Sequence, residues 1–344
     1  MNNSASSFLR VCAAFLAIVL AGVPCAGRAQ DAALKVATIP IDTGAEAFYA
    51  LDQGFFKKNG LDVSIERITN GPAIAAAVAS GAVDVGFSNL VSLAIAFKKG
   101  VPITLIAAAG MYSSKAPTTT CMVALNSPIK SAKDLNGKIF ATNGLKNIGE
   151  FAPRAWIDKN GGDSSTVKFV EMPFPDMAGA LTQGRIDAAV MAEPTMTESK
   201  GQSRFFSNCY DGIGSSYMIG AYFATTSWAA AHPDLVRKFQ ASIRDTAIWA
   251  NKNPLLSAAI LARESKMNPD IAAKMFRAVY PERLEASAIQ PVIDVTAKYG
   301  ALPASFPATD MMYQGRQRVA ASSASFTMSR ESTSVVETRR TSRR

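Results

Sequence analysis

The stretch Ala79-Ser80-Gly81-Ala82-Val83-Asp84-Val85-Gly86 has a counterpart later in the chain, Leu181-Thr182-Gln183-Gly184-Arg185-Ile186-Asp187-Ala188-Ala189. Each stretch reads as the end of a helix, a glycine, a short turn, and an aspartate at the start of a buried strand. Glycine supplies the left-handed backbone that closes a helix, and the aspartate can accept hydrogen bonds from local backbone N–H groups. The repetition predicts two similar α/β units in one chain.

Strand-like and helix-like runs alternate on both sides of these two stretches. We expect strands at residues 34–39, 62–68, 83–87, 103–108, 121–125, 138–142, 167–171, 186–191 and 219–225. We expect helices at residues 45–59, 72–80, 90–99, 131–135, 150–160 and 176–183, and a mostly helical run over 227–299. Strands that alternate with helices of this length indicate βαβ units and largely parallel sheets.

The two ends of the chain differ in composition from its body. Residues 1–29 have Arg10, an apolar run over 11–21 and small residues up to Ala29, which is the layout of a signal peptide. The apolar run is shorter than the ~20 residues that a membrane span needs. We therefore expect cleavage near Ala29 and a periplasmic location. Residues 314–344 are rich in Ser, Thr and Arg, which predicts a disordered basic tail.

The positive charge lies mainly at these ends. The whole chain has 36 basic and 27 acidic side chains and a net charge of +9. Residues 1–30 hold two arginines, and residues 314–344 hold seven arginines and two glutamates, so 27 basic and 25 acidic side chains remain in residues 31–313. A nucleic-acid-binding fold needs a basic patch on its body. The distribution argues against a nucleic-acid partner.

Cysteine and histidine are scarce. Cleavage leaves Cys121 and Cys209, which form either one disulfide in an oxidising compartment or two separate buried thiols. His232 is the single histidine and precedes Pro233, where we expect a surface or capping residue. The count excludes catalytic pairs with a histidine base and metal sites with several histidines. We predict no catalytic residue, no metal site, no cofactor and no enzymatic activity.

Several motifs, in their order and spacing, resemble the substrate-binding proteins of ABC transporters in the nitrate/sulfonate/taurine (SsuA-like) and NMT1/THI5-like group. The stretches that carry the resemblance are Gln53-Gly54-Phe55-Phe56-Lys57-Lys58-Asn59-Gly60-Leu61-Asp62-Val63, Ser80-Gly81-Ala82-Val83-Asp84-Val85-Gly86, Ser131-Ala132-Lys133-Asp134-Leu135-Asn136-Gly137-Lys138, Gln183-Gly184-Arg185-Ile186-Asp187-Ala188 and Glu193-Pro194. The likeness covers residues 31–313.

The resemblance implies a type II periplasmic-binding-protein fold, with two Rossmann-like lobes, a ligand cleft and a two-strand hinge. Lobe I would comprise residues 30–117 and 222–313, and lobe II residues 118–221. The chain would cross the hinge near residues 116–121 and 218–224. The implied function is delivery of a small organic solute or anion, of the nitrate, sulfonate, taurine or pyrimidine kind, to an ABC permease and ATPase complex. We expect a monomer.

The loops that follow the strands are the predicted ligand site, because ligands of open parallel sheets bind outside the carboxyl ends of the strands, beside helix N-termini. The predicted ligand-binding residues are Asp42, Thr43, Asn70, Gly71, Ser88, Asn89, Asn143, Lys146, Phe174, Asp176 and Glu193. For each Ser, Asn or Asp, plain helix capping is an open alternative. For Phe174 the alternative is ordinary loop packing, and for Glu193 it is a backbone bond that fixes the hinge.

The charges in these loops bear on the ligand. Lys146 is the one cation among the predicted residues, whereas Asp42, Asp176 and Glu193 favour a ligand with hydrogen-bond donors. We therefore prefer a neutral or zwitterionic ligand over a simple anion. Two alternatives from other classes stay open: an enzyme like the thiamine-precursor pyrimidine synthases of this group, and a ligand-sensing receptor module.

Overall fold

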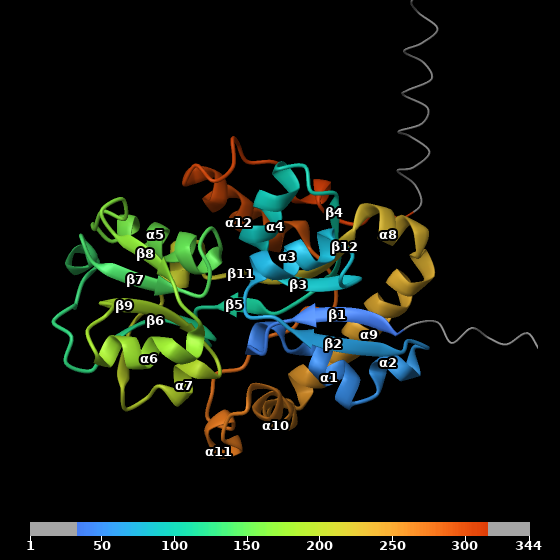
Figure 1. The fold of residues 1–344 in the computed structure, drawn as a ribbon, viewed down its shortest axis with the longest axis horizontal. Coiled ribbons are helices and arrows are strands. Elements are labelled where there is room, and N and C mark those ends of the chain that lie inside the picture. Colours follow the sequence, from blue (N-terminus) through green and yellow to red (C-terminus); the bar gives the residue numbers. More distant parts are fainter. Residues whose placement is uncertain (1–32, 316–344) are drawn as a thin grey trace, which may run out of the picture. The chain divides into compact units, whose positions relative to one another are not determined.

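The computed structural model describes residues 33–315. The predicted signal peptide and the predicted tail beyond residue 315 lie outside the described residues. The described chain forms two five-stranded sheets and one two-stranded sheet, with helices on the faces of the larger sheets (Figure 1). This confirms the predicted α/β class.

The first sheet has the strand order β2-β1-β3-β12-β4. Its strands are β1 (Leu34–Thr38), β2 (Val63–Arg67), β3 (Val85–Asn89), β4 (Ile103–Ala108) and β12 (Gly220–Thr225). β1 is parallel to β2 and β3, whereas β12 lies antiparallel to both β3 and β4. The carboxyl ends of β1 to β4 therefore lie at one edge, which we call the carboxyl edge of this sheet.

Helices cover both faces of the first sheet. One face carries α1 (Glu46–Asp52), α2 (Phe55–Lys58) and α9 (Pro233–Lys252), and the other carries α3 (Gly71–Ala79), α4 (Leu90–Lys98) and α12 (Ala286–Lys298) (Figure 1). The aromatic rings of Phe87, Tyr222 and Phe239 pack together beneath the first group. The remaining helices of this part are α8 (Thr226–Ala231), α10 (Pro254–Ser265) and α11 (Pro269–Ala272), with 3-10 turns at Asp42–Gly44 and Ala308–Asp310.

The second sheet has the order β10-β6-β9-β7-β8. Its strands are β6 (Thr119–Ala124), β7 (Ile139–Thr142), β8 (Lys168–Glu171), β9 (Ala188–Ala192) and β10 (Ser203–Ser207). α5 (Ile148–Lys159) covers one face, together with 3-10 turns at Ala132–Leu135 and Cys209–Gly212, and α6 (Phe174–Thr182) and α7 (Thr195–Glu198) cover the other (Figure 1). β7, β8 and β9 are parallel and share a carboxyl edge.

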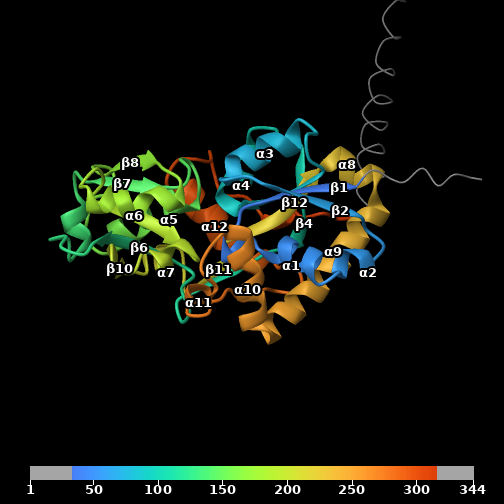
Figure 2. The same ribbon diagram turned by 60° about the horizontal axis from the view of Figure 1, so that its bottom comes forward.

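Two short segments join the sheets. β5 (Met111–Ser113) and β11 (Ser216–Met218) pair antiparallel as the two-stranded sheet. The crossings that the resemblance implies, near residues 116–121 and 218–224, lie next to these two strands and extend into β6 and β12. In the second view, α12 lies beside α4 and α5, which cover different sheets (Figure 2). The lobe boundaries stay a prediction.

The repeated stretch behaves alike in both sheets. Gly81 and Gly184 have φ of 75° and 66°, which is the left-handed region expected for a helix-closing glycine. The Asp84 carboxylate accepts a hydrogen bond from the Lys35 N–H at 2.8 Å, and the Asp187 carboxylate accepts one from the Ile139 N–H at 2.9 Å. In each case the aspartate fastens the start of its strand to the neighbouring strand. The two aspartates accept backbone hydrogen bonds at the starts of their strands as predicted, but the donors lie on a neighbouring strand and not locally in the sequence.

Other details differ from the sequence prediction. The helix expected over 45–59 is divided into α1 and α2 at Gly54, whose φ is 72°. The sequence pattern does not predict β10. In residues 33–315, no helix has both the length and the apolar character that a membrane crossing requires.

Candidate functional site

The loops at the carboxyl edge of the first sheet begin with helix caps. The Asn70 side chain accepts a hydrogen bond from the Ala73 N–H at the start of α3, and Asn89 accepts one from the Ser92 N–H at the start of α4. Between them, a Cβ on Gly71 would lie only 2.8 Å from Asn89 Nδ2 and closer still to Ser88 Oγ. Glycine at position 71 therefore allows these two loops to touch.

The loop after β7, in the second sheet, contacts these two loops of the first sheet. Asn147 Nδ2 donates to Asn143 Oδ1 at 3.0 Å, which folds the loop after β7 onto itself. The Ile148 N–H, at the start of α5, donates to Asn89 Oδ1 at 3.2 Å. Asn89 thus caps one helix and bonds to the first turn of another. We call residues 70–71, 88–89 and 143–148 the facing loops, since they bring five predicted ligand residues, Asn70, Gly71, Ser88, Asn89 and Asn143, to one place.

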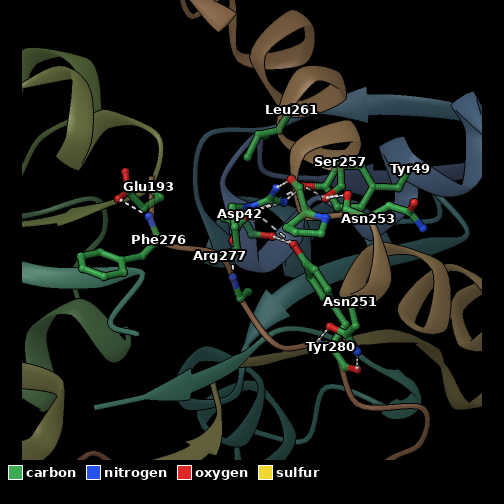
Figure 3. Close-up of polar contacts among 12 residues, drawn as sticks. Asp42, Tyr49, Glu193, Asn251, Asn253, Ser257, Leu261, Phe276, Arg277 and Tyr280 are labelled. Carbon is green, nitrogen blue, oxygen red and sulfur yellow. Dashed lines mark hydrogen bonds and ion pairs between the residues drawn. The ribbon is translucent and has the colours of Figure 1, made fainter. Parts of the chain in front are cut away.

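Both carboxylate oxygens of Asp42 are hydrogen-bonded to other residues of the protein, so the group is not free to bind a ligand. Its Oδ1 lies 2.7 Å from Arg277 Nη2, and it also accepts hydrogen bonds from the Tyr49 and Tyr280 hydroxyls and from the Ala278 N–H (Figure 3). The side chain is 1% exposed. A buried carboxylate needs such partners, and these partners account for Asp42 as a structural residue that fastens the loop after β1 to residues 277–280.

Glu193 follows β9 in the second sheet, and it bonds to the same segment of the chain as Asp42 does. Its carboxylate accepts from the Thr197 N–H at 3.0 Å, the Thr197 hydroxyl at 2.8 Å and the Phe276 N–H at 3.1 Å (Figure 3). The Asp42 N–H donates to the Glu193 backbone oxygen at 3.0 Å. Burial, with the Asp42 charge, raises the pKa of Glu193 to about 7, although the Thr197 and Phe276 donors favour the charged form. We call residues 276–280 the anchor segment.

The other predicted residues take no part in the contact between the facing loops, although Lys146 lies within residues 143–148. Lys146 adopts a left-handed φ of 56°, and its exposed side chain lines a cavity between α4, α5 and the end of α12. Phe174 is buried at the start of α6, and Asp176 is exposed in the first turn of that helix. Thr43 is buried, and its backbone oxygen accepts from the Gly110 N–H. Lys146 gives no support for an anion at the facing loops.

Three of the cavities in the described structure have room for a small solute, and of the facing-loop residues Lys146 alone lines one of these three. One of about 420 Å³ lies between β6, β10, α7 and Phe276. The second, about 450 Å³, contains Lys146, and the third, about 340 Å³, lies beside the anchor segment. The facing loops are therefore in contact with each other rather than separated by one of these cavities.

Buried polar atoms without a partner give an independent indication of the site. Among residues 33–315 they are both carboxyl oxygens of Glu46 and single side-chain oxygens of Ser88, Thr118, Ser207 and Asn208. Glu46 follows the loop after β1, and Ser88 is the penultimate residue of β3, which leads directly into α4. The Thr118 carbonyl accepts from the Glu193 N–H, which places Thr118 beside the end of β9. Each of these three is at a carboxyl edge, and we call Glu46, Ser88 and Thr118 the unpaired edge.

The sequence analysis does not identify Glu46 or Thr118. Burial, and secondarily the charge of Asp42, raise the pKa of Glu46 well above its usual value. Nothing in the sequence distinguishes Glu46 from the many glutamates that occupy the first turn of a helix for electrostatic reasons. Thr118 belongs to a run of three threonines, Thr118 to Thr120, whose members alternate between faces once the strand is known.

The two remaining cysteines are joined. The structure has a disulfide between Cys121 in β6 and Cys209 in the following 3-10 turn, with the Cα atoms 5.7 Å apart. Of the two arrangements left open by the sequence, the structure has the bridge. It holds the face of the second sheet against the turn that packs on α5. His232 is exposed, and its Nδ1 lies 2.9 Å from the Trp228 carbonyl oxygen.

Known proteins resemble this chain in both fold and sequence. The alkanesulfonate-binding protein SsuA from Xanthomonas axonopodis pv. citri, solved bound to MOPS, superposes with a TM-score of 0.68 over 82% of this chain and 98% of that one, at 17% identity. A protein of Candida albicans described as having the generic periplasmic-binding-protein fold superposes with a TM-score of 0.66 over 82% and 96% of the chains, at 13% identity. The predicted fold class is confirmed.

Sequence relatives are mostly binding proteins. One from Brucella abortus is 26% identical over 262 residues, which is 72% of this chain and 79% of the relative. The taurine-binding periplasmic protein of Escherichia coli is 25% identical over 211 residues, 60% and 64% of the two chains. A relative of another kind, the 4-amino-5-hydroxymethyl-2-methylpyrimidine phosphate synthase of Schizosaccharomyces pombe, is 23% identical over 224 residues, 60% and 62%.

These relatives support a solute-binding role. The family model described as NMT1/THI5 like matches residues 44–256, which is more than half of the chain and includes α1, the facing loops and Glu193. The chain therefore belongs to the NMT1/THI5 like family.

Proposed function

We propose that this protein captures a small organic solute between the carboxyl edges of its two sheets and delivers it to an ABC importer without chemical change. The unpaired edge is the observation that carries the proposal. An unpartnered hydroxyl or carboxyl that is removed from water costs free energy, and native proteins rarely keep one without a reason. A solute held at these edges supplies the missing partners.

The architecture favours the same location. Ligands of open α/β sheets bind outside the carboxyl ends of strands. Glu46 begins the helix that follows β1, Ser88 is near the end of β3, and Thr118, which precedes β6, lies beside the end of β9. The set includes both sheets, since Thr118 belongs to the second and the other two to the first. A solute that bonds to all three joins the sheets and favours their approach.

The facing loops of the two sheets are joined by the hydrogen bond from the Ile148 N–H to Asn89 Oδ1, which can be broken and remade as the sheets open and close. Entry of a solute requires that the Ile148 to Asn89 bond of the facing loops be released, and capture restores it. β5 and β11 are short connecting strands and take the role of the hinge. Closure around the solute then distinguishes the loaded form for a membrane permease, as in hinge-closing binding proteins.

Several further features belong to this proposal. We propose export to the periplasm with residues 1–29 as a cleaved signal peptide, function as a monomer, and lobes with the boundaries given above. The facing-loop residues Asn70, Gly71, Ser88, Asn89 and Asn143 are the proposed contacts from the predicted set. The taurine-binding periplasmic relative supports this assignment.

A thermal-shift screen of the purified protein tests the proposal. Taurine, MOPS, nitrate, pyrimidines, aromatic dicarboxylates and amino acids are added at millimolar concentration. A solute with a micromolar Kd stabilises the folded state by about 4 kcal/mol under these conditions, because stabilisation grows as RT ln(1 + [L]/Kd). At least one compound is expected to raise Tm. Absence of any shift across such a panel contradicts the proposal.

The pyrimidine synthase relative supports one alternative, an enzyme of the same fold. Mass spectrometry of the bound compound separates the two functions. A solute recovered unchanged after prolonged incubation agrees with binding alone, whereas conversion of the solute or covalent loss of a protein side chain supports the enzyme.

A further inference from the structure

We propose that the cavity of about 420 Å³ between β6, β10, α7 and Phe276 is a second ligand site, and that it takes a small amphipathic carboxylate, a molecule with an apolar ring or chain and one acid group. We call it the side cavity. No residue of the facing loops or of the unpaired edge lines it. The inference goes beyond solute capture and does not depend on it.

The interior of the side cavity is apolar. Met122 in β6 and Met196 in α7 are buried in its wall, and the Thr120 hydroxyl lies 3.4 Å from the first sulfur and 2.9 Å from the second. Phe205 and Phe276 also line it, and they are 54% and 46% exposed. A ring that covers these side chains removes apolar surface from water and makes favourable contacts with the thioethers.

The charged residues that line the side cavity are basic. They are Lys200, two residues beyond α7, and Arg204 in β10, and no acidic residue of the described chain is part of the lining. Neither cation has an ion pair within residues 33–315. Arg204 donates to the neutral carbonyl oxygens of Ser127 and Ile129, which leaves its charge uncompensated. Two such charges beside an apolar cavity favour an anion.

Two acids touch the wall from behind. The Asp211 carboxylate accepts from the Ser114 hydroxyl, and the Glu193 carboxylate accepts from the Phe276 N–H at 3.1 Å. Neither acid lines the side cavity. An occupant therefore meets the two cations directly, and it meets the two acids only through residues of the wall.

A side-chain amide without a partner adds a polar contact. Asn208 follows β10 and lines the side cavity, and its side-chain oxygen is buried without a hydrogen-bond partner in the described chain. Its side-chain nitrogen has no partner there either. A half turn of the amide exchanges the two atoms, so the N–H group can face the cavity. A carboxylate accepts from an amide N–H and from an ammonium group, and it satisfies Asn208 and Lys200 together.

An occupant of the side cavity contacts two parts of the molecule. The Phe276 ring of the anchor segment points away from Asp42 and Arg277 (Figure 3), whereas Met122, Met196 and the other lining residues belong to the second sheet and its connections. A ligand between them adds to the bond from the Phe276 N–H to Glu193. The site therefore fits an effector that stabilises the contact between the anchor segment and the second sheet.

Three matched probes that differ in charge test the inference by isothermal titration: 3-phenylpropionate, 3-phenylpropanol and 3-phenylpropylamine. The wild-type protein is expected to bind the carboxylate with a submillimolar Kd, the alcohol about fivefold more weakly and the amine more weakly still. Lys200→Gln should weaken binding of the carboxylate about fivefold and leave the alcohol unchanged. Phe205→Ser should weaken both about tenfold, because the ring contact is lost.

Matched controls come from exposed positions outside the side cavity. Lys159 is exposed at the end of α5, and Leu255 is 66% exposed on α10. Lys159→Gln and Leu255→Ser should leave the affinities for all three probes unchanged. Lys200 and Phe205 are exposed as well, so all four variants are expected to fold, which thermal denaturation checks.

Hydrogen–deuterium exchange with 3-phenylpropionate locates the site. Increased protection is expected in residues 117–122 and 200–208. Protection of the facing loops instead would show that the probe enters the solute site, which overturns the inference and leaves solute capture standing. Equal affinities for the three probes, an unchanged preference for the carboxylate in Lys200→Gln, or a folded protein that does not bind the carboxylate also overturns the inference, and none of these results bears on solute capture.

Discussion

The anchor segment and the unpaired edge are neighbouring buried regions with opposite hydrogen-bonding. At the anchor segment, Asp42 and Glu193 have all their carboxyl oxygens engaged by Arg277, Phe276 and other donors (Figure 3). At the unpaired edge, Glu46, Ser88 and Thr118 have no partner among the described residues. Stability of the fold explains the first region, and the proposed solute would supply the missing partners of the second. If the proposal holds, completeness of hydrogen bonding separates structural from functional polar groups here better than residue type.

Breaking the ion pair of the anchor segment should give the largest effect on stability. Arg277→Met leaves the Asp42 carboxylate buried without its cation and is expected to destabilise the fold by about 3–5 kcal/mol, as for other buried pairs that lose one member. Urea denaturation measures the change. Arg237→Met is the control, because Arg237 pairs with Asp234 at an exposed position and should matter little. Equal effects of the two variants would show that the anchor segment is not a structural element.

The pH dependence of stability tests the role of Glu193 at the anchor segment. Its pKa is raised to about 7 in the folded protein from a usual value of 4.5, so protonation favours the folded state. Stability should rise as pH falls from 8 towards 5, and about 3 kcal/mol of this change comes from Glu193. Denaturation of the wild type and Glu193→Gln at several pH values measures it. The variant should show a flatter profile, since its side chain cannot titrate.

A wild-type protein that loses stability as pH falls through this window, or a Glu193→Gln profile as steep as that of the wild type, would contradict the assignment. Glu46 titrates in the same direction, so the difference between the two profiles, rather than either profile alone, isolates Glu193.

A matched pair of serine substitutions should give the smallest effect on stability, and this effect is specific to the unpaired edge. Ser88 and Ser242 are both 0% exposed. Of their two side-chain hydroxyls, only that of Ser242 has a hydrogen bond, which it donates to the Lys238 carbonyl oxygen at 2.9 Å. Ser242→Ala should cost about 1 kcal/mol, whereas Ser88→Ala should be neutral or slightly stabilising without solute. Denaturation curves of the two variants decide this. A similar cost for both would show that Ser88 has a structural partner and does not belong to a binding site.

Ser88→Ala should nevertheless weaken solute binding, and Ser242→Ala should not. Ser88→Ala is thus expected to lower affinity without lowering stability, and Ser242→Ala to lower stability without lowering affinity. This opposite behaviour is what membership of Ser88 in the unpaired edge predicts. If Ser88→Ala leaves affinity unchanged, the solute contacts other groups.

Much of the fold is predictable from the sequence because local signals repeat. Gly81 and Gly184 close helices, and Asp84 and Asp187 start strands, so short-range rules locate both units. The topological rule for parallel sheets also selects, from strand order alone, the loops that contain Asn70, Ser88 and Asn89.

The roles of individual charges are not predictable from the sequence. The partner of Asp42 is Arg277, 235 positions away, and no local pattern reports such a pairing. Lys146 belongs to a loop in the predicted set, but its left-handed backbone directs the side chain to the cavity between α4, α5 and α12. Glu46 differs from an ordinary helix-start glutamate only through burial, which depends on how α1 packs on the sheet. These are tertiary properties.

Hydrogen–deuterium exchange of the protein, with and without the solute found in the thermal-shift screen, tests solute capture between the two carboxyl edges most directly. The account predicts that the solute increases protection together in residues 44–47, 70–74, 88–92 and 143–149, which belong to both sheets. Protection confined to the cavity formed by Met196, Phe205 and Phe276, or to the cavity between Lys99 and Tyr299, would contradict it.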